Sequence, residues 1–403
     1  MTIYRVKFDA PGSQSGDSWN DALTDLQTAI NTATSGDEIW VAAGIYKPGT
    51  TREDSFQLKD GVTIYGGFAG TENSLDERNV KTNVTILSGD IGTSNDDSDN
   101  SHTVVKLSSN STATLDGFTI QDGNNTQNDD NSDDGGGVYN AGNLTLKNVV
   151  VRDNKAADDG GGIRNNGTIT IIDSTIADNE SVGGSQTSGG GGLINTGESA
   201  TIINSTFSNN IAKNGGAIRN DTVLNLINST LSGNTASESG GGLANTINPR
   251  TSSSATATIN NSTITDNKAR NKSQQDIDLA GGGIANFAVL NISNSIIAGN
   301  ENNNNLADDL ANDFVISGTI PGTSLVIDLP VTGTNTSGGN NIIGNGENVS
   351  GFTDGTNNDQ VGTQAQPINP LLDTLKDNGG ATKTHALLDG SPAINAYKRR
   401  YSL

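Results

Sequence analysis

The chain has 403 residues, of which 32% are hydrophobic and 4% aromatic, and it contains 51 glycines and no cysteine. So few apolar side chains exclude a large conventional globular core, and the lack of cysteine excludes disulfides and thiolate metal sites. The formal net charge of -22 disfavours nucleic acid and anionic membrane surfaces as partners, because both would be repelled. The regular spacing of Ile, Leu and Val favours thin, repeated strands over disorder.

The N-terminal segment, residues 1–38, predicts a cap over the start of a repetitive fold. Ser18 or Asp17 can cap a short amphipathic helix there. The residues expected on its apolar face are Trp19, Leu23, Leu26, Ile30 and Ala33. The first residues lack the apolar core of a signal peptide, and no stretch approaches the roughly 20 apolar residues of a membrane helix. We therefore expect a helical cap and no membrane span.

A glycine-rich motif then recurs at intervals of 25, 30, 25, 25 and 41 residues. Its six copies are GGGVYN (135–140), GGGIRN (160–165), GGGLIN (190–195), GGAIRN (215–220), GGGLAN (240–245) and GGGIAN (281–286). A phosphate-binding loop would occur once, between a strand and a helix, so the repetition indicates scaffold. Glycine suits a tight bend where a side chain would collide with the next repeat.

A second motif lies between the glycine motifs and contains two apolar columns. The six residues at its second position are Leu146, Ile171, Ile202, Leu226, Ile259 and Ile292. The six at its seventh position are Val151, Ile176, Phe207, Leu231, Ile264 and Ile297. Each copy closes on an asparagine, namely Asn154, Asn179, Asn210, Asn234, Asn267 and Asn300. We expect the apolar columns to point inward, and the asparagines to occupy left-handed turns with their amides bonded from one repeat to the next.

A unit of about 25 residues with several short strands predicts one coil of a parallel β-helix. The expected fold class is therefore all-β, a right-handed single-stranded parallel β-helix. We expect an N-terminal cap with a short helix at 1–38, coils over 39–345 with clear repeats at 135–300, and a C-terminal capping segment and tail at 346–403. A solenoid of this kind needs caps because its open ends would otherwise pair with other chains.

Several segments outside the central repeats resemble the bacterial choice-of-anchor Q β-helix proteins. They are GDEIWVAAGIYKP (36–48), LKDGVTIYGGFAGTENSLDERN (58–79), TILSGDIG (85–92) and KDNGGATKTHALLDGSPAIN (376–395). The pieces at 207–210 and 215–218 are also similar to polymorphic outer membrane proteins. The resemblance implies a right-handed parallel β-helix that is exported or attached to the cell surface. The chain departs from the choice-of-anchor pattern after Asn395, where it continues as AYKRRYSL.

Two pairs of aspartates precede adjacent glycine motifs and suggest a calcium site. Asp133 and Asp134 lie 25 residues before Asp158 and Asp159, so one coil would separate the pairs. Four carboxylates at the strand spacing of ~4.8 Å would repel one another unless a cation lay between them. Calcium prefers such oxygen ligands. The alternative is that these are solvated loop aspartates.

An arginine near these aspartates raises a catalytic alternative. Tyr139, Arg164 and Arg219 fall in the outward column of the glycine-motif strand, which makes them candidate ligand-binding residues. Asp158, Asp159 and Arg164 together resemble the calcium and arginine arrangement of β-helical pectate lyases. There a metal acidifies the C–H bond beside a uronate and the arginine removes the proton. Paired aspartates could instead act as acid and base of a glycoside hydrolase, and the alternative for the arginines is surface solubility.

The main interpretation is a non-enzymatic, extracellular or cell-surface protein that acts as an adhesin or binds glycan or matrix components. It needs no cofactor, and calcium is the only one that the sequence suggests. The expected partner is a polysaccharide or a cell-surface component, and the expected oligomeric state is a monomer. The alternative function is a calcium-dependent polysaccharide lyase or a glycoside hydrolase. Fold-level analogy contributes to both interpretations, and it is weaker than site chemistry as a guide to function.

Overall fold

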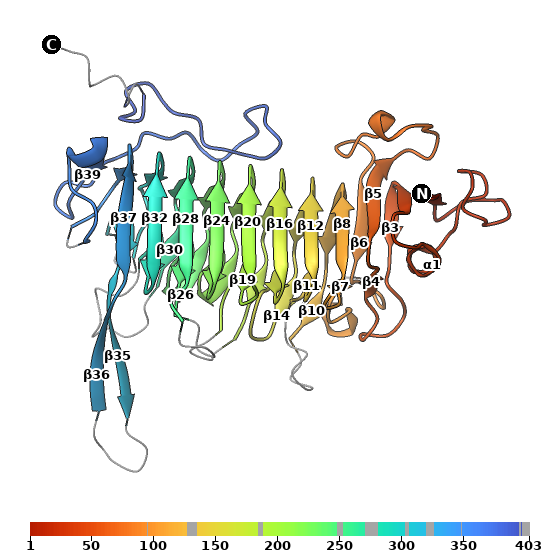
Figure 1. The fold of residues 1–403 in the computed structure, drawn as a ribbon, viewed down its shortest axis with the longest axis horizontal. Coiled ribbons are helices and arrows are strands. Elements are labelled where there is room, and N and C mark those ends of the chain that lie inside the picture. Colours follow the sequence, from red (N-terminus) through yellow and green to blue (C-terminus); the bar gives the residue numbers. More distant parts are fainter. Residues whose placement is uncertain are drawn as a thin grey trace. The chain divides into compact units, whose positions relative to one another are not determined.

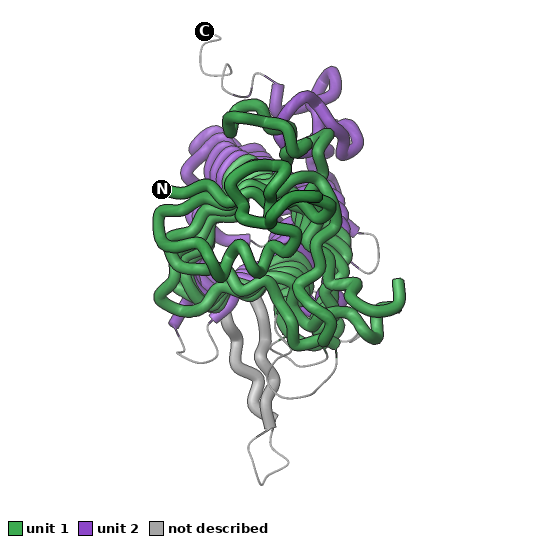
Figure 2. Tube along the Cα trace, turned by 90° about the vertical axis from the view of Figure 1, so that its right-hand side faces the viewer, with its two compact units in different colours: residues 1–205 green, residues 206–403 purple. Residues whose placement is uncertain are grey.

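The computed structural model describes residues 1–403 except 95, 127–134, 184–187, 248–252, 271–280, 303–305, 320–325, 348, 395 and 397–403. The chain divides into two compact units, Met1–Ser205 (unit 1) and Thr206–Leu403 (unit 2), which Figure 2 colours separately. The division falls inside the region 39–345 that we expected to form coils. The three-part organisation inferred from the sequence remains a prediction.

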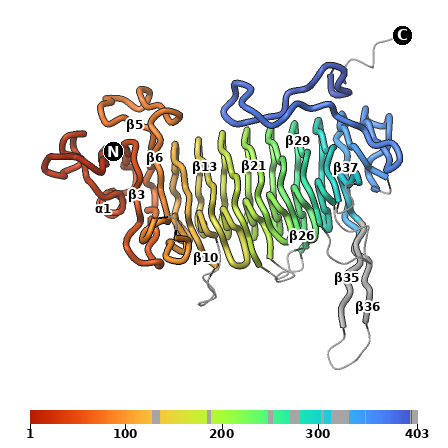
Figure 3. Tube along the Cα trace, turned by 180° about the vertical axis from the view of Figure 1, so that it is seen from behind, coloured from red at the N-terminus to blue at the C-terminus, as the bar shows by residue number. Residues whose placement is uncertain are grey.

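Unit 1 consists of coils that each add one short strand to several parallel sheets (Figures 1 and 3). The first sheet has the order β1 (Ile3–Val6), β2 (Glu38–Ala42), β5 (Val62–Phe68), β8 (Thr112–Asp116), β12 (Asn143–Lys147), β16 (Thr168–Ile172) and β20 (Ser199–Ile203). The second has the order β3 (Gly44–Tyr46), β6 (Thr85–Ser88), β9 (Phe118–Gln121), β13 (Val150–Arg152) and β17 (Thr175–Ala177). The third has the order β4 (Phe56–Leu58), β7 (Val105–Leu107), β11 (Val138–Asn140), β15 (Ile163–Asn165) and β19 (Leu193–Asn195). A short fourth sheet contains β10 (Asn124–Asn125), β14 (Lys155–Ala156) and β18 (Glu180–Ser181).

Unit 2 repeats the same four strand types. Strands of the first type are β24 (Val223–Ile227), β28 (Thr256–Asn260), β32 (Val289–Ser293) and β37 (Thr334–Gly339), and those of the second are β21 (Thr206–Ser208), β25 (Thr230–Ser232), β29 (Thr263–Thr265), β33 (Ile296–Ile297), β38 (Ile342–Ile343) and β39 (Gln360–Val361). Strands of the third type are β23 (Ile218–Asn220), β27 (Leu243–Asn245), β31 (Ile284–Asn286) and β34 (Leu310–Ala311). Strands of the fourth type are β22 (Ile211–Asn214), β26 (Thr235–Ser239) and β30 (Lys268–Ala269). An antiparallel hairpin of β35 (Asp313–Thr319) and β36 (Val326–Thr332) interrupts the coils. The all-β, right-handed parallel β-helix predicted from the sequence is confirmed.

The two apolar columns predicted from the repeat form the interior of the coils. In unit 1, Leu146 pairs with Ile171 and Ile171 with Ile202, and all three side chains are fully buried. The members of both columns in unit 2 are also buried. Each coil places apolar side chains at equivalent positions, so these side chains stack along the axis and form a continuous core.

The glycine motifs form bends that exclude side chains. The first glycine of each copy has a positive φ, as Gly160 does at 68°. The second is confined by the neighbouring coil, because a Cβ on Gly161 would lie 2.5 Å from the carbonyl oxygen of Glu180, whereas the third position is Ala217 in one copy. The expectation that glycine is required for close packing between coils is confirmed at these positions.

The closing asparagines bond to one another as predicted, but their backbones are not left-handed. Asn154 Nδ2 lies 3.0 Å from Oδ1 of Asn179, and both residues are fully buried. The positive φ belongs to the residue before each of them, such as Asp153 at 55° and Asp178 at 58°. The preceding residue makes the bend because the asparagine must point inward, where its amide bonds the backbone of its own and the neighbouring coil.

The N-terminal helix is shorter and begins later than predicted. Helix α1 spans Leu26–Thr32, and its N-cap is Asp25, whose carboxylate accepts a hydrogen bond from Thr28 N at 2.6 Å. The proposed cap Ser18 instead holds a turn, in which its hydroxyl accepts from Asp21 N at 3.0 Å. The segment after that turn is extended against β1, because Leu23 forms a parallel bridge with Val6. Pairing with the first sheet therefore replaces the first turn expected for the helix.

Three short 3-10 helices lie outside the sheets, namely η1 (Leu75–Glu77), η2 (Asp97–Asp99) and η3 (Thr356–Asn358). The described part of the chain contains no helix long and apolar enough to cross a membrane.

Candidate functional site

The predicted calcium ligands are only partly described by the structure. Asp133 and Asp134 lie outside the described residues. Asp158 Oδ1 accepts a hydrogen bond from the hydroxyl of Ser188. Asp159 forms an ion pair with Arg164, in which Nη1 and Oδ2 are 2.5 Å apart. Protein groups therefore already occupy the two described carboxylates, and calcium binding by the four aspartates remains a prediction.

The candidate arginines are buried in ion pairs and do not lie on an exposed surface. Arg164 is 2% exposed, and its Nε donates to Asn166 Oδ1 at 3.1 Å. Arg219, in unit 2, is 4% exposed and its Nε donates to Asp221 Oδ1 at 2.9 Å. The expectation that these side chains simply aid solubility is wrong, because both arginines are buried and each forms an ion pair with an aspartate. Tyr139 pairs with Arg164 in adjacent strands, and its hydroxyl accepts from Asn166 Nδ2 at 3.1 Å.

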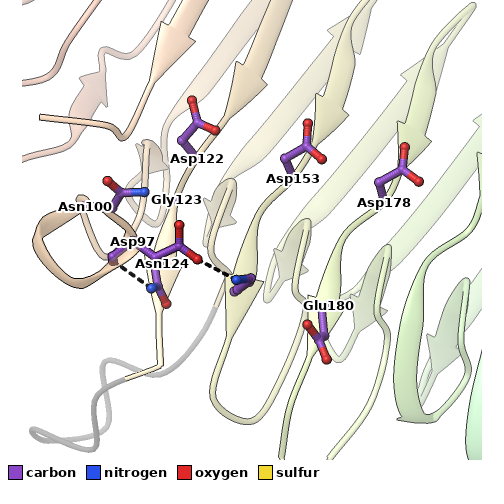
Figure 4. A pocket seen from close by; sticks show the side chains of 9 residues that line it. Asp97, Asn100, Asp122, Gly123, Asn124, Asp153, Asp178 and Glu180 are labelled. Carbon is purple, nitrogen blue, oxygen red and sulfur yellow. Dashed lines mark hydrogen bonds and ion pairs between the residues drawn. The ribbon is translucent and has the colours of Figure 1, made fainter. Parts of the chain in front are cut away.

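The structure instead places a polar cavity of about 230 Å³ within unit 1, where the second sheet turns into the fourth (Figure 4). We call it the acidic groove. Its lining residues are Asp97, Asn100, Asp122, Gly123, Asn124, Asp153, Lys155, Asp178 and Glu180. Five of these side chains are carboxylic acids and one is an amine, so the groove has an excess of negative charge.

The coil register arranges most of these side chains in two rows. One row contains Asp122, Asp153 and Asp178, which follow β9, β13 and β17 and have φ values of 62°, 55° and 58°. Figure 4 shows their carboxylates side by side along successive coils. The other row contains Asn124, Lys155 and Glu180, which pair directly in β10, β14 and β18. Neighbouring members of a row are separated by the strand spacing of ~4.8 Å.

The carboxylate row carries an electrostatic cost at Asp153, its central member. Burial raises the pKa of Asp153, the carboxylates of Asp178 and Asp122 raise it further, and Arg152 opposes the shift. Arg152 Nη1 lies 3.0 Å from the Asp153 carboxylate. Asp122 is held by Ser88 Oγ, which donates to its Oδ2 at 2.8 Å. The backbone thus fixes like charges near one another, with one exposed arginine as partial compensation.

A loop that contains η2 lies across one end of the groove. Lys155 Nζ lies 2.5 Å from Asp97 Oδ2, and Asn124 Nδ2 donates to the carbonyl oxygen of Asp97 at 2.8 Å. The hydrogen bond to Asp97 raises the pKa of Lys155, against the effect of burial. The lysine is therefore a stable cation, and the loop is attached to the row that contains Asn124 and Lys155.

Two amide side chains in the groove have carbonyl oxygens that lack a hydrogen-bond partner. Asn100 is 6% exposed and Asn124 is 7% exposed, and Oδ1 of each is buried without a partner within the described structure. A buried acceptor that stays unpaired costs on the order of 1 to 3 kcal/mol, and most buried polar groups are paired. These oxygens are therefore unsatisfied acceptors in the groove lining, and a donor from a ligand would reach them only after their side chains turn toward it.

The arrangement favours a ligand that donates hydrogen bonds. The carboxylates and the two amide oxygens are acceptors, while Lys155 already has an acidic partner. The described residues contain no group of three or more His, Asp or Glu side chains in an arrangement that could hold a metal ion. The groove resembles a binding surface for hydroxyl or amino groups more than a metal centre.

Sequence analysis did not find this groove, although a signal was present. The residue before each closing asparagine is aspartate at both Asp153 and Asp178, and Asp122 occupies the same place one coil earlier. The asparagines repeat in every copy, which indicates packing, whereas the neighbouring column is aspartate in only some copies. The unpaired amides could not be found in this way, since Asn100 and Asn124 lie outside the clear repeats.

Comparisons with known proteins do not assign the chain to a family. No family model matches it, and no curated protein shows significant similarity to it. The resemblance to choice-of-anchor Q and polymorphic outer membrane proteins is therefore not confirmed. Among solved structures, the crystal structure of the pectate lyase Pel9A is similar with 14% identity and a TM-score of 0.45, over 73% of this chain and 69% of that one. The structure of AlyGC, an alginate lyase of the PL6 family, has 11% identity and a TM-score of 0.25, over 96% of this chain and 55% of that one. Both similarities are too distant to transfer an activity.

Proposed function

We propose that this protein is a non-enzymatic carbohydrate-binding β-helix protein that acts outside the cell or at its surface, and that the acidic groove is its glycan site. The observation that carries the proposal is the pair of buried, unpaired carbonyl oxygens of Asn100 and Asn124. Sugar hydroxyl groups are donors that would satisfy them. The carboxylates of the two rows would accept further hydrogen bonds from the same ligand.

The geometry of the rows supports an extended polymer as the ligand. In the row of Asp122, Asp153 and Asp178, carboxylates recur at ~4.8 Å, which is close to the length of one pyranose unit in an extended polysaccharide. The scaffold holds them on paired backbone, so little conformational entropy would be lost on binding. A rigid surface with a repeated set of acceptors is suited to hold successive sugars in the same way.

The charged residues give less support to a lyase. Proton abstraction requires a base that is unprotonated near the working pH, but the pKa of Lys155 is raised and Arg164 is paired with Asp159. The arginine suggested by the sequence is therefore unsuited to be the base of a lyase, whereas burial lowers the pKa of Lys106, which pairs with Tyr139 in the same sheet. Calcium is not required by the proposal, and its role is tested by including a chelator.

The test is binding of the full chain to a panel of neutral, uronate-containing and amino polysaccharides, measured by affinity electrophoresis with calcium or with chelator. We expect retardation by at least one glycan, lost when Asn100 and Asn124 are both replaced by Leu. Unaltered migration on every polysaccharide would refute the proposal. Ultraviolet absorbance of unsaturated products, followed on the same samples, would reveal lyase activity.

A glycoside hydrolase is a second candidate because of one observation at Asp153. Its raised pKa, between two other carboxylates, is the property that a general acid needs beside a base. If this candidate is correct, new reducing ends should accumulate on a bound glycan and should disappear in Asp153→Asn. Binding without product would leave the binding function alone.

A further inference from the structure

We propose that the ligand of the acidic groove is a cationic polysaccharide with free amino groups on successive sugars, of the polyglucosamine class. This inference rests on the proposed glycan-binding function and specifies its ligand. It separates the groove from a site for neutral glycans and from one for acidic glycans bridged by calcium.

The first argument is charge. The groove contains five acidic side chains against the single amine of Lys155, and the chain as a whole has a net charge of -22. An acidic polysaccharide would meet repulsion from both the groove and the whole-protein field. A neutral polysaccharide would leave the repulsion between Asp122, Asp153 and Asp178 in place. A ligand with ammonium groups would relieve it.

The second argument is hydrogen-bond polarity. The unpaired buried atoms in the groove, Asn100 Oδ1 and Asn124 Oδ1, are both acceptors. An ammonium group is a donor only, with three hydrogens, so it complements both the amide oxygens and the carboxylates. Hydrogen bonds in which one partner is charged are about twice as strong as neutral ones.

The third argument is that the groove already contains an ammonium group. The Lys155 ammonium, in the row of Asn124 and Glu180, pairs with Asp97, and the amide of Asn124 contacts the same aspartate. Asp178 and Glu180 lie one coil further along, one in each row of the groove. Lys155 pairs with Glu180 in β14 and β18, and the negative charge of Glu180 contributes to the raised pKa of Lys155. An amino sugar at that coil would repeat the arrangement that Lys155 shows.

The raised pKa of Asp153 is consistent with this ligand. Its cause is burial together with neighbouring carboxylates, and a nearby positive charge would counteract both. Asp122, Asp178, Arg152 and Lys155 are the charged groups around it. Binding of an amino glycan should therefore be accompanied by ionisation of any protonated Asp153.

The experiment compares three oligosaccharides of equal length by isothermal titration calorimetry with the full chain at mildly acidic pH. They are a glucosamine oligomer, its fully N-acetylated counterpart and a neutral glucan. We expect the glucosamine oligomer to bind at least about tenfold more tightly than either of the others, a difference of about 1.4 kcal/mol. Its affinity should fall steeply with added salt, because surface charges are screened.

The variant that tests the groove is the double substitution Asp153→Asn and Asp178→Asn. Asparagine tolerates the left-handed backbone at both places, so the fold should be kept. We expect about a tenfold loss of affinity for the glucosamine oligomer. The matched control is Asp173→Asn with Asp266→Asn, two turn aspartates with φ of 51° and 58° outside the groove, and its affinity should not change.

The possible outcomes separate the two proposals. Equal binding of the acetylated or neutral oligomer would overturn the inference and leave the glycan-binding function standing. Binding of polygalacturonate that requires calcium would also overturn it. No binding of any glycan would overturn both. Equal losses in the groove variant and the control would show that general charge attraction, and not the groove, holds the ligand.

Discussion

Asp153 and Asn154 are neighbours in the chain, yet they belong to two regions with opposite properties. Asn154 points into the coil, is fully buried, and its amide bonds Asn179 and backbone carbonyl groups. Asp153 points outward into a row of like charges that raises its pKa. The same pair recurs one coil later as Asp178 and Asn179. The inner row supplies stability through satisfied hydrogen bonds, whereas the outer row brings like charges together at the surface.

Unit 2 shows that the outer row is not required by the fold. The residues before its closing asparagines are Asn209, Gly233, Asp266 and Gly299, and all four have positive φ. The closing asparagines themselves remain fully buried there. The backbone therefore accepts glycine, asparagine or aspartate at the outer position, and the run of aspartates in unit 1 has no structural cause.

The largest expected effect comes from breaking the inner row with Asn179→Ala. This change removes an amide that donates to the carbonyl oxygens of Val151 and Ala177 and accepts from Asn154, all at about 3 Å. Leaving these buried groups unpaired should cost about 3 to 5 kcal/mol. Urea denaturation followed by circular dichroism measures it. The neighbouring Asp178→Asn is the control, and a similar loss in both variants would contradict the distinction between the rows.

The second effect concerns an aspartate placed in the inner row of unit 2. Asp309 ends the asparagine ladder: its Oδ1 accepts from Asn300 Nδ2 at 2.8 Å, and its Oδ2 accepts from Asn345 N at 2.7 Å. Burial raises its pKa from 3.8 to about 7, against the effect of these hydrogen bonds. The folded state therefore holds a proton that the unfolded state releases. Stability should fall as pH rises from about 4 to about 7, by on the order of a few kcal/mol.

The variant Asp309→Asn should remove this pH dependence. Asn345 N loses an acceptor, which adds a cost that does not depend on pH, so the slope is the quantity to compare. Unfolding free energies of wild type and variant across this pH window provide it. If the plots of unfolding free energy against pH were parallel for wild type and variant, the pKa of Asp309 would be the same in the folded and unfolded states, which would contradict the prediction.

A smaller effect of opposite sign is expected at the outer row. Asp153→Asn removes one of three neighbouring carboxylates and should stabilise the protein by about 0.5 kcal/mol after allowance for solvent screening. The gain should shrink in high salt. Thermal unfolding of this variant beside Asp173→Asn tests it, and destabilisation by Asp153→Asn alone would show that its pair with Arg152 outweighs the repulsion.

The smallest effect on stability is expected for Asn100→Ala. The Oδ1 of this side chain has no partner to lose, so the change should cost less than about 0.5 kcal/mol, in contrast to Asn179→Ala. Glycan affinity should nevertheless fall about fivefold, because a donor from the ligand loses its acceptor. A large loss of stability would mean that Asn100 belongs to the scaffold.

The sequence repeat made the coils predictable but gave no information about the acidic groove. The inward columns, the asparagine ladder and the glycine bends were inferred correctly because each coil must repeat them in order to pack. Sites built from residues that differ between coils have no such period. The sequence suggested a site at the pair Asp158 and Asp159 because of their charge, but the structure gives these carboxylates the partners Ser188 and Arg164.

The N-terminal helix shows a different limit. Trp19 and Leu23 fit the face of a helix, yet Leu23 bridges to Val6 and only Leu26–Thr32 is helical. Local periodicity describes the preference of one segment, whereas pairing with the edge of a sheet depends on a strand that lies elsewhere in the chain.

By itself the sequence determined the class of fold, the inner columns of the coils and the exclusion of thiol chemistry, because these follow from composition and from a period that every coil shares. Only the tertiary structure decided which polar residues meet. It buried Arg164 and Arg219 in ion pairs, aligned Asp122, Asp153 and Asp178, and placed Asn100 and Asn124 beside them. The physical reason is that register between coils brings together residues that are separated in sequence by whole coils. The loops between them differ in length, so no sequence period predicts which residues meet.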